Sequence, residues 1–284
     1  LNVILHQDNS APVVSATLQY HVGSKDEDDG LKGFAHLFEH MLGKETKNMD
    51  SGQWGKIYSA RGGSGNASTS VDLTNYYVTV PSNSLKLALW RYSEIMLHPI
   101  IEQETIDIQR EAVKEEKRLR YNQPYIPRFY DYLKRNFFKK HPYQHPIIGY
   151  FEDLDSSSLE DFLNFKEKFY APSNAVFVVA GDIDIDETKK LISEYFDEIP
   201  YKGEKPEKNY PLEDPLSKEI RVKEYDPNIQ IPALFYAFRT PAISNRDSAV
   251  ISYIAQHLSG SESSTLYKKL VDEKQMALGV QSFN

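Results

Sequence analysis

Two histidines and a glutamate in one short segment have the residue types and spacing of a metal site. His36, Glu39 and His40 form the pattern H-x-x-E-H. In a helix, residues four positions apart project from the same face, so both imidazoles can bind one zinc ion at about 2.0 to 2.1 Å. The Glu39 carboxylate suits a general base that accepts a proton from water. The alternative is two core histidines beside a surface glutamate. Because the chain has only 8 histidines in 284 residues, we favour a metal site.

A catalytic zinc usually has three protein ligands and one open position, so a further ligand must come from elsewhere. The acidic segment 102–120 is the clearest source. At about 100° per residue, Glu116 falls within an apolar stripe, and a buried carboxylate needs a bound cation or a buried Arg as its partner. The stripe consists of Ile106, Ile108, Ala112, Val113 and Leu119, with Gln109 on the same side. Glu111, Glu115 and Lys117 fit a solvated run of charges better than Glu116 does.

The composition excludes several classes of protein. The absence of cysteine excludes disulfide frameworks, thiolate zinc sites, iron–sulfur clusters and cysteine nucleophiles. The formal net charge of −8 argues against a nucleic-acid partner. The longest apolar run, residues 175–180, is far shorter than the roughly 20 residues that span a bilayer, so we expect a soluble chain without a membrane span. The chain starts at Leu1 without a basic and apolar leader, so the compartment is not indicated, and the bacterial periplasm and the cytoplasm both fit.

Hydrophobic periodicity predicts an α+β fold, with a mixed or antiparallel sheet covered by helices mainly on one face. Strands are predicted at residues 1–6 and 12–22, on both sides of a turn at 72–74, and at 175–180. Helices are predicted at residues 31–42, 51–60, 82–97, 102–120, 127–138, 158–169 and 185–196. His98, His141 and His145 each precede a proline and are interpreted as structural.

The order of elements seen at the start of the chain recurs after residue 226, with an offset of roughly 215 residues. A strand is expected at residues 231–238, and helices at 246–258 and 264–272. We therefore predict a catalytic zinc-binding domain at 1–200, a charged and proline-rich linker at 201–226, and at 227–284 the first part of a second, similar and non-catalytic domain. The alternative to an internal repeat is coincidence, because a strand followed by two helices is a common arrangement.

Three motifs of the chain are residues 33–41 (GFAHLFEHM), 62–69 (GGSGNAST) and 113–116 (VKEE) with the following residues 118–124. Together they resemble the pitrilysin and insulinase zinc peptidases, the family that includes the mitochondrial processing peptidase. The bacterial, processing-peptidase-like branch is the most similar. The resemblance implies His36, His40 and Glu116 as zinc ligands and Glu39 as the base. The 76 positions from His40 to Glu116 agree with the family's gap of roughly 75.

The resemblance also implies a substrate-binding strand and points to one departure. Residues 62–69 correspond to the strand whose edge receives the peptide backbone, and Asn66 and Ala67 match the family's substrate-binding pair; without the resemblance, this segment also fits a plain glycine-rich hairpin. The family usually has an acidic residue two helical turns before the distal ligand, where this chain has Gln109. The loss of a carboxylate that supports the ligands predicts a slower enzyme, unless another group takes its place.

The resulting expectation is a zinc-dependent endopeptidase that hydrolyses extended peptides or unfolded segments. The family resemblance implies a clamshell chamber completed by a second homologous domain or subunit. The competing hypothesis is a non-catalytic family member that acts as a partner or assembly subunit. A purely structural zinc module is disfavoured, because such sites use four protein ligands and no fourth candidate is evident.

Overall fold

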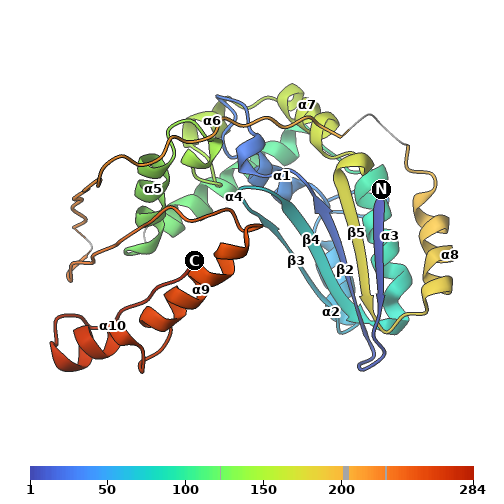
Figure 1. Cartoon of the computed structure of the whole chain (residues 1–284). Helices are drawn as coiled ribbons and strands as arrows, with labels where there is room; N and C mark the ends of the chain where they lie inside the picture. Colours follow the sequence, from blue (N-terminus) through green and yellow to red (C-terminus); the bar gives the residue numbers. More distant parts are fainter. Residues whose placement is uncertain (122, 201–204, 228) are drawn as a thin grey trace. The chain divides into compact units, whose positions relative to one another are not determined.

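A five-stranded mixed sheet organises the first part of the chain, as the computed structural model shows for residues 1–121, 123–200, 205–227 and 229–284 (Figure 1). Its strand order is β1-β5-β2-β4-β3. The strands are β1 (Asn2–Gln7), β2 (Val13–Tyr20), β3 (Ser64–Thr69), β4 (Thr74–Pro81) and β5 (Ala175–Gly181). Only β1 and β5 pair in parallel, and the other neighbours are antiparallel. The predicted α+β class with a mixed sheet is confirmed.

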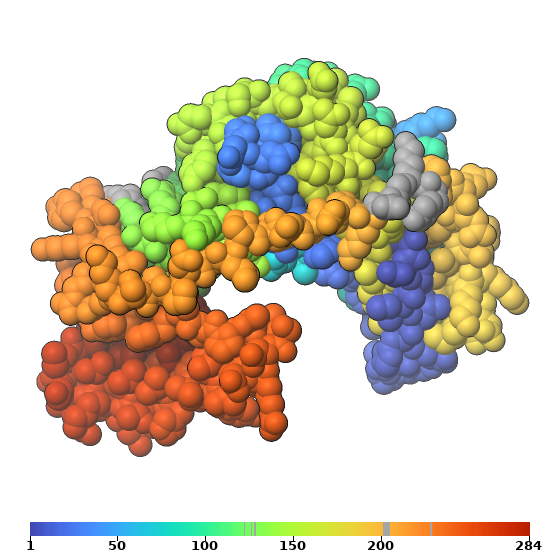
Figure 2. Space-filling model, turned by 45° about the horizontal axis from the view of Figure 1, so that its top comes forward, coloured from blue at the N-terminus to red at the C-terminus, as the bar shows by residue number. Residues whose placement is uncertain are grey.

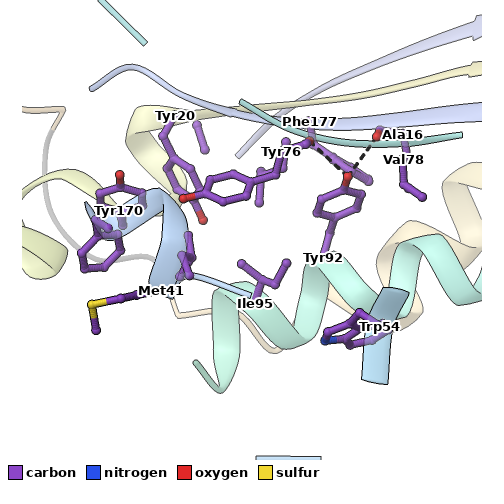
Figure 3. Packing of buried hydrophobic residues seen from close by; sticks show 14 of the residues in the cluster. Ala16, Tyr20, Met41, Trp54, Tyr76, Val78, Tyr92, Ile95, Tyr170 and Phe177 are labelled. Atoms are coloured by element: carbon purple, nitrogen blue, oxygen red, sulfur yellow. Dashed lines mark hydrogen bonds between the residues drawn. The ribbon is translucent and has the colours of Figure 1, made fainter. Parts of the chain in front are cut away.

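One face of the sheet is buried because apolar residues alternate along its strands. In β2 the buried positions are Val14, Ala16, Leu18 and Tyr20, as the alternation predicts. The helices against this face are α1 (Phe34–Met41), α2 (Gln53–Ala60) and α3 (Leu85–Leu97). The Tyr92 hydroxyl of α3 contacts the carbonyl oxygens of Ala16 and Tyr76 at 3.0 and 3.1 Å (Figure 3). This contact fixes α3 across β2 and β4.

The remaining helices of this part follow the predicted order. They are α4 (Gln103–Tyr121), α5 (Ile126–Phe137), α6 (Phe151–Ser156), α7 (Leu159–Phe169) and α8 (Ile185–Phe196). Short 3-10 turns occur at η1 (Ser24–Asp26), η2 (Ser82–Ser84), η3 (Pro142–Gln144) and η4 (Pro172–Asn174). Helix α6 and these turns were not expected from periodicity, because they span too few residues to show it. No helix in the described part of the chain has the length and apolar character needed to cross a bilayer.

The chain divides into two compact units, Leu1–Pro232 and Ala233–Asn284. The second unit contains α9 (Arg246–Ser259), α10 (Thr265–Tyr267) and the π-helical η5 (Lys268–Glu273), which agrees with the helices expected there. The strand expected at 231–238 is wrong, since these residues form no regular secondary structure. A strand needs a neighbour to accept its backbone hydrogen bonds, and the described residues of this unit contain none.

Part of the segment predicted as a linker lies against the first unit. Residues 201–204 fall outside the described part, and residues 205–227 run over the surface as the light-orange stretch in Figure 2. Lys208 Nζ lies 2.9 Å from the Asp26 carboxylate, and the Tyr210 hydroxyl donates to the same group. Glu213 Oε1 accepts the backbone amides of residues 139–141 at 2.6 to 2.7 Å. This stretch therefore contributes to the structure of the first unit.

Candidate metal centre

Helix α1 carries the H-x-x-E-H pattern, and its first turn is held by a carboxylate from another segment. The helix starts after Gly33, whose φ of 105° lies in the left-handed region, and Gly33 has no side chain to cap it. A Cβ at Gly33 would lie 2.9 Å from Gly149 Cα, so only glycine fits. The Glu27 carboxylate accepts the backbone amides of Gly33 and Ala35, each at 2.8 Å. These bonds satisfy free amides at the helix start and fix its position.

Aromatic packing fixes the rotation of α1 about its axis. Phe34 stacks on Phe162 of α7 with ring centroids 4.4 Å apart, and Phe38 lies 6.0 Å from Phe165 of the same helix. Phe34 and Phe38 are fully buried. Since these side chains occupy the core side of α1, His36, Glu39 and His40 are brought toward α4 and β3, which both contact α1.

The structure brings all three predicted ligands together. The Nε2 atoms of His36 and His40 lie 3.6 and 3.4 Å from the same carboxylate oxygen, Glu116 Oε2. One ligand atom from each residue lies within 4.8 Å of the others, and the described residues contain no other such group of three. The side chain of His36 is nearly buried, whereas those of His40 and Glu116 are 27% and 26% exposed. The cluster is therefore accessible from solvent on one side.

The helical stripe that led to Glu116 was partly misplaced. Ile108 and Leu119 are each 59% exposed, so they do not belong to the buried face. That face consists of Ile106, Gln109, Val113 and Lys117. Glu116 lies at its edge, one turn from Val113, which is why its carboxylate can reach α1 without being fully buried. The error arose because α4 has apolar residues on two sides, and only tertiary packing selects one of them.

Lys117, which the charge pattern placed in a solvated run, is instead buried. Only 8% of the residue is exposed, and its Nζ donates to the Gly149 carbonyl. The ammonium group also lies 5.0 to 5.4 Å from the ring centroids of Tyr121, Tyr150 and Phe151. Aromatic faces and a carbonyl together replace the water that a lysine normally requires.

Burial changes the protonation of the cluster in the direction that metal binding needs. It lowers the pKa of His36 to about 3. Burial also lowers the pKa of His40, although Glu116 opposes that change. Both imidazoles are therefore neutral near pH 7, and neutral imidazole is the form that binds metal ions. Their contacts with Glu116 are consequently not ion pairs, since an ion pair would require protonated histidine.

Glu39 and Glu116 are each held by a further polar side chain. The Thr69 hydroxyl donates to Glu39 Oε2 at 2.5 Å, and burial raises the pKa of Glu39 while this bond opposes the rise. The Arg120 guanidinium pairs with Glu116 Oε1, the oxygen not facing the histidines. Sequence reasoning missed Glu27, Thr69 and Arg120. The i, i+4 spacing of Arg120 to Glu116 is the one signal that was available for any of them.

The predicted substrate residues lie on β3, the outermost strand on its side of the sheet. Asn66 is exposed, and its Oδ1 accepts the backbone amide of Ala67 at 2.9 Å. Ala67 is half-buried and packs against the core. Gln109 is 7% exposed, on the inner face of α4. The structure thus places these three residues, but their roles stay predictions.

A family model described as insulinase, Peptidase family M16, matches residues 2–150, which is more than half of the chain. The chain belongs to the insulinase family of peptidases. The model of the Peptidase M16 inactive domain matches residues 156–284. The resemblance found in the sequence motifs is thereby confirmed.

Insulinase-family relatives extend beyond this chain. The chain is 28% identical over 281 residues to zinc protease PqqE of Helicobacter pylori, covering 98% of this chain and 63% of that protein. It is 26% identical over 261 residues to an uncharacterized zinc protease of Mycobacterium leprae, covering 92% and 58%. The chain thus spans about three fifths of the length of these relatives.

Solved structures of two proteases have the same fold. The crystal structure of a protease from Helicobacter pylori matches with a TM-score of 0.78 and 26% identity, over 97% of this chain and 69% of that one. Pitrilysin matches with a TM-score of 0.66 and 24% identity, over 74% and 23% of the two chains. The pitrilysin match supports the fold alone.

The donor set fits a zinc ion. Two imidazole nitrogens and one carboxylate oxygen are the ligand types found at catalytic zinc sites, and they leave one coordination position open. Nε2 is the nitrogen of His36 that faces the cluster, since it lies 3.6 Å from Glu116 Oε2. The other ring nitrogen, Nδ1, is buried and has no hydrogen-bond partner among the described residues.

Proposed function

We propose that this chain contains the catalytic site of a zinc-dependent endopeptidase, in which His36, His40 and Glu116 bind zinc and Glu39 is the general base. The observation that carries the proposal is the convergence of both His Nε2 atoms on one oxygen of Glu116. Glu39 lies between the two histidines on the same short helix. Membership of the insulinase family supports the same reaction class.

The protein residues supply the proton transfers. When bound, zinc supplies Lewis acidity toward a peptide carbonyl and increases the acidity of water. Glu39 accepts a proton from the attacking water and later gives it to the leaving amine. Glu39 Oε2 already accepts the Thr69 hydroxyl, and Oε1 accepts no hydrogen bond from the other described residues, so Oε1 is the oxygen available for this proton.

We further propose that the substrate is an extended peptide that adds to the open edge of β3. Among the described residues this strand pairs with β4 alone, so its other edge offers unpaired backbone groups. Backbone pairing with β3 gives affinity that tolerates different peptide sequences. Asn66 and Ala67 lie on this strand, where a peptide backbone would pass them.

A second homologous domain or subunit would complete a clamshell chamber around the site. In this proposal residues 1–200 are the catalytic domain, 201–226 a connection and 227–284 part of a second, non-catalytic domain. The match of residues 156–284 to the inactive-domain model of the family supports a non-catalytic second part. The relative from Helicobacter pylori is longer than this chain, which agrees with a chamber that includes residues beyond those of this chain.

The second candidate function is a non-catalytic partner subunit, and Gln109 is the observation that favours it. The family's usual acidic residue is replaced by a neutral amide on the buried face of α4. Because such supporting groups change metal affinity or activity by about 10- to 100-fold, the replacement argues for reduced activity. The complete set of His36, Glu39, His40 and Glu116 favours the enzyme.

Zinc stoichiometry of the purified chain tests the ligand assignment. We expect one zinc per wild-type chain and none in His40→Ala or Glu116→Ala, because two remaining ligands hold zinc poorly. Glu111→Ala is the matched control, since Glu111 is exposed on the same helix and is expected to retain zinc. A folded wild type that takes up no zinc after supplementation would refute the proposal.

Peptide cleavage separates the base from the ligands. Glu39→Gln is expected to retain one zinc and to lose turnover, because an amide cannot accept the proton. Loss of zinc in Glu39→Gln to the extent seen in His40→Ala would contradict the roles assigned to these residues. Cleavage of an unstructured peptide by the wild type, abolished by a chelator and restored by zinc, would exclude the non-catalytic alternative.

A further inference from the structure

Thr69 joins the strand proposed to bind substrate to the residue proposed as the base. Thr69 is the last residue of β3, and its hydroxyl donates to Glu39 Oε2 at 2.5 Å. Side chains two apart in a strand share a face, so Thr69 points to the same side as Ala67, which packs against the core. Helix α1 contacts β3 on this side. The contact therefore crosses from the edge strand to the helix that holds the base.

The backbone around Thr69 is fixed on two sides. Thr69 pairs with Thr74 in β4. In the turn that follows, the Ser70 amide donates to the Leu73 carbonyl at 2.8 Å. The Ser24 amide of η1 donates to the Ser70 carbonyl at 3.1 Å, which links this turn to η1. The hydroxyl of Thr69 is thus presented from a rigid position, which a positioning group requires.

We propose that Thr69 is a positioning residue that holds Glu39 for proton transfer. The inference rests on the proposed peptidase function. The Thr69 hydroxyl fixes one carboxylate oxygen, Oε2, and Oε1 accepts no hydrogen bond from the other described residues, so Oε1 is available to accept a proton.

Kinetics of Thr69→Val and Thr69→Ser test the proposal. Valine has nearly the same shape without the hydroxyl, and serine retains the hydroxyl. We expect Thr69→Val to lower kcat on the order of 10- to 100-fold, the usual range for groups that support a catalytic site, with KM and zinc content unchanged. Thr69→Ser is expected to recover most of the loss. Thr105→Val is the control, since Thr105 lies in the first turn of α4, about 16 Å along the helix from Glu116.

Binding of a peptide hydroxamate gives a readout that does not depend on turnover. A hydroxamate needs both the zinc site and a well-placed Glu39 carboxylate, so its affinity is expected to fall about 10-fold in Thr69→Val. If Thr69→Val has the kcat and the hydroxamate affinity of the wild type, the role of Thr69 is refuted, whereas the proposed peptidase function is not. An equal loss of kcat in Thr69→Ser and Thr69→Val would also overturn the role of Thr69. A zinc-loaded wild type that neither cleaves peptides nor binds the hydroxamate would refute the proposed function, and the inference with it.

Discussion

Replacing Glu27 with glutamine tests whether the start of α1 is held by the residue that follows η1. The Glu27 side chain is fully buried and accepts two backbone amides at 2.8 Å. Glutamine has the same shape but only one acceptor oxygen, so one buried N–H loses its partner at a cost of about 1 to 3 kcal/mol. Burial raises the pKa of Glu27, and loss of a buried charge offsets part of that cost. We therefore expect a net loss at the lower end of this range, about 1 kcal/mol in the free energy of unfolding.

Urea denaturation followed by tryptophan fluorescence measures this loss. Both tryptophans, Trp54 and Trp90, lie in the first unit, so the signal reports that unit alone. Asp29→Asn is the matched control, because Asp29 is an exposed acid in the same turn and its change is expected to stay within about 0.5 kcal/mol. Wild-type stability in Glu27→Gln would show that these hydrogen bonds do not hold α1, and would refute the reasoning.

Three further changes follow from the same contacts. Arg120→Gln removes the guanidinium group that pairs with Glu116 Oε1. Zinc affinity, measured by competition with a chelator, should therefore fall about 10-fold. Unchanged zinc affinity would contradict this role of Arg120. Gln109→Glu restores an acid on the buried face of α4 and should raise peptide turnover about 10-fold, whereas equal or lower turnover would show that the acid is not limiting. Burial lowers the pKa of His145 to about 4, below its ordinary value of 6.5. At this residue the unfolded chain therefore binds more protons between these pH values, so His145 should contribute a loss of about 3 kcal/mol on acidification through that window, measured as the difference in pH dependence between the wild type and His145→Asn.

The parts of the site that lie within one helix could be predicted from the sequence. His36, Glu39 and His40 have an i, i+3, i+4 relation that α1 realises. Glu116 was also found, although the stripe used to find it included Ile108, which is exposed. The alternation in β2 likewise predicted its buried face, because a strand's period depends only on local geometry.

Contacts between distant segments could not be predicted in this way. Lys117 is buried because Gly149, 32 residues away, offers a carbonyl. Thr69 lies 30 residues from Glu39, and nothing in the spacing indicates that they meet. The charge of a side chain predicts exposure only when no partner exists in the fold, and such partners become known only from tertiary structure.

These distant contacts imply that the cluster is formed before any metal binds. Helix α1 has only 8 residues, too few to be stable alone. Its position comes instead from the Glu27 carboxylate at its start, the core packing of Phe34 and Phe38, and the close approach of Gly33 to Gly149. None of these contacts involves the proposed ligands, so zinc is not needed to assemble them. This differs from small zinc domains, in which metal binding drives folding.

Metal removal should accordingly leave the chain folded. We expect the chelated chain to keep its far-ultraviolet circular dichroism and a cooperative thermal transition. Added zinc should raise the melting temperature with zinc concentration, as binding to the native state alone requires. The folded variant Glu116→Ala should show the metal-free melting temperature at every zinc concentration. Loss of helical signal on chelation would mean that the ligands themselves hold α1 in place, contrary to the contacts made by Glu27 and Phe34.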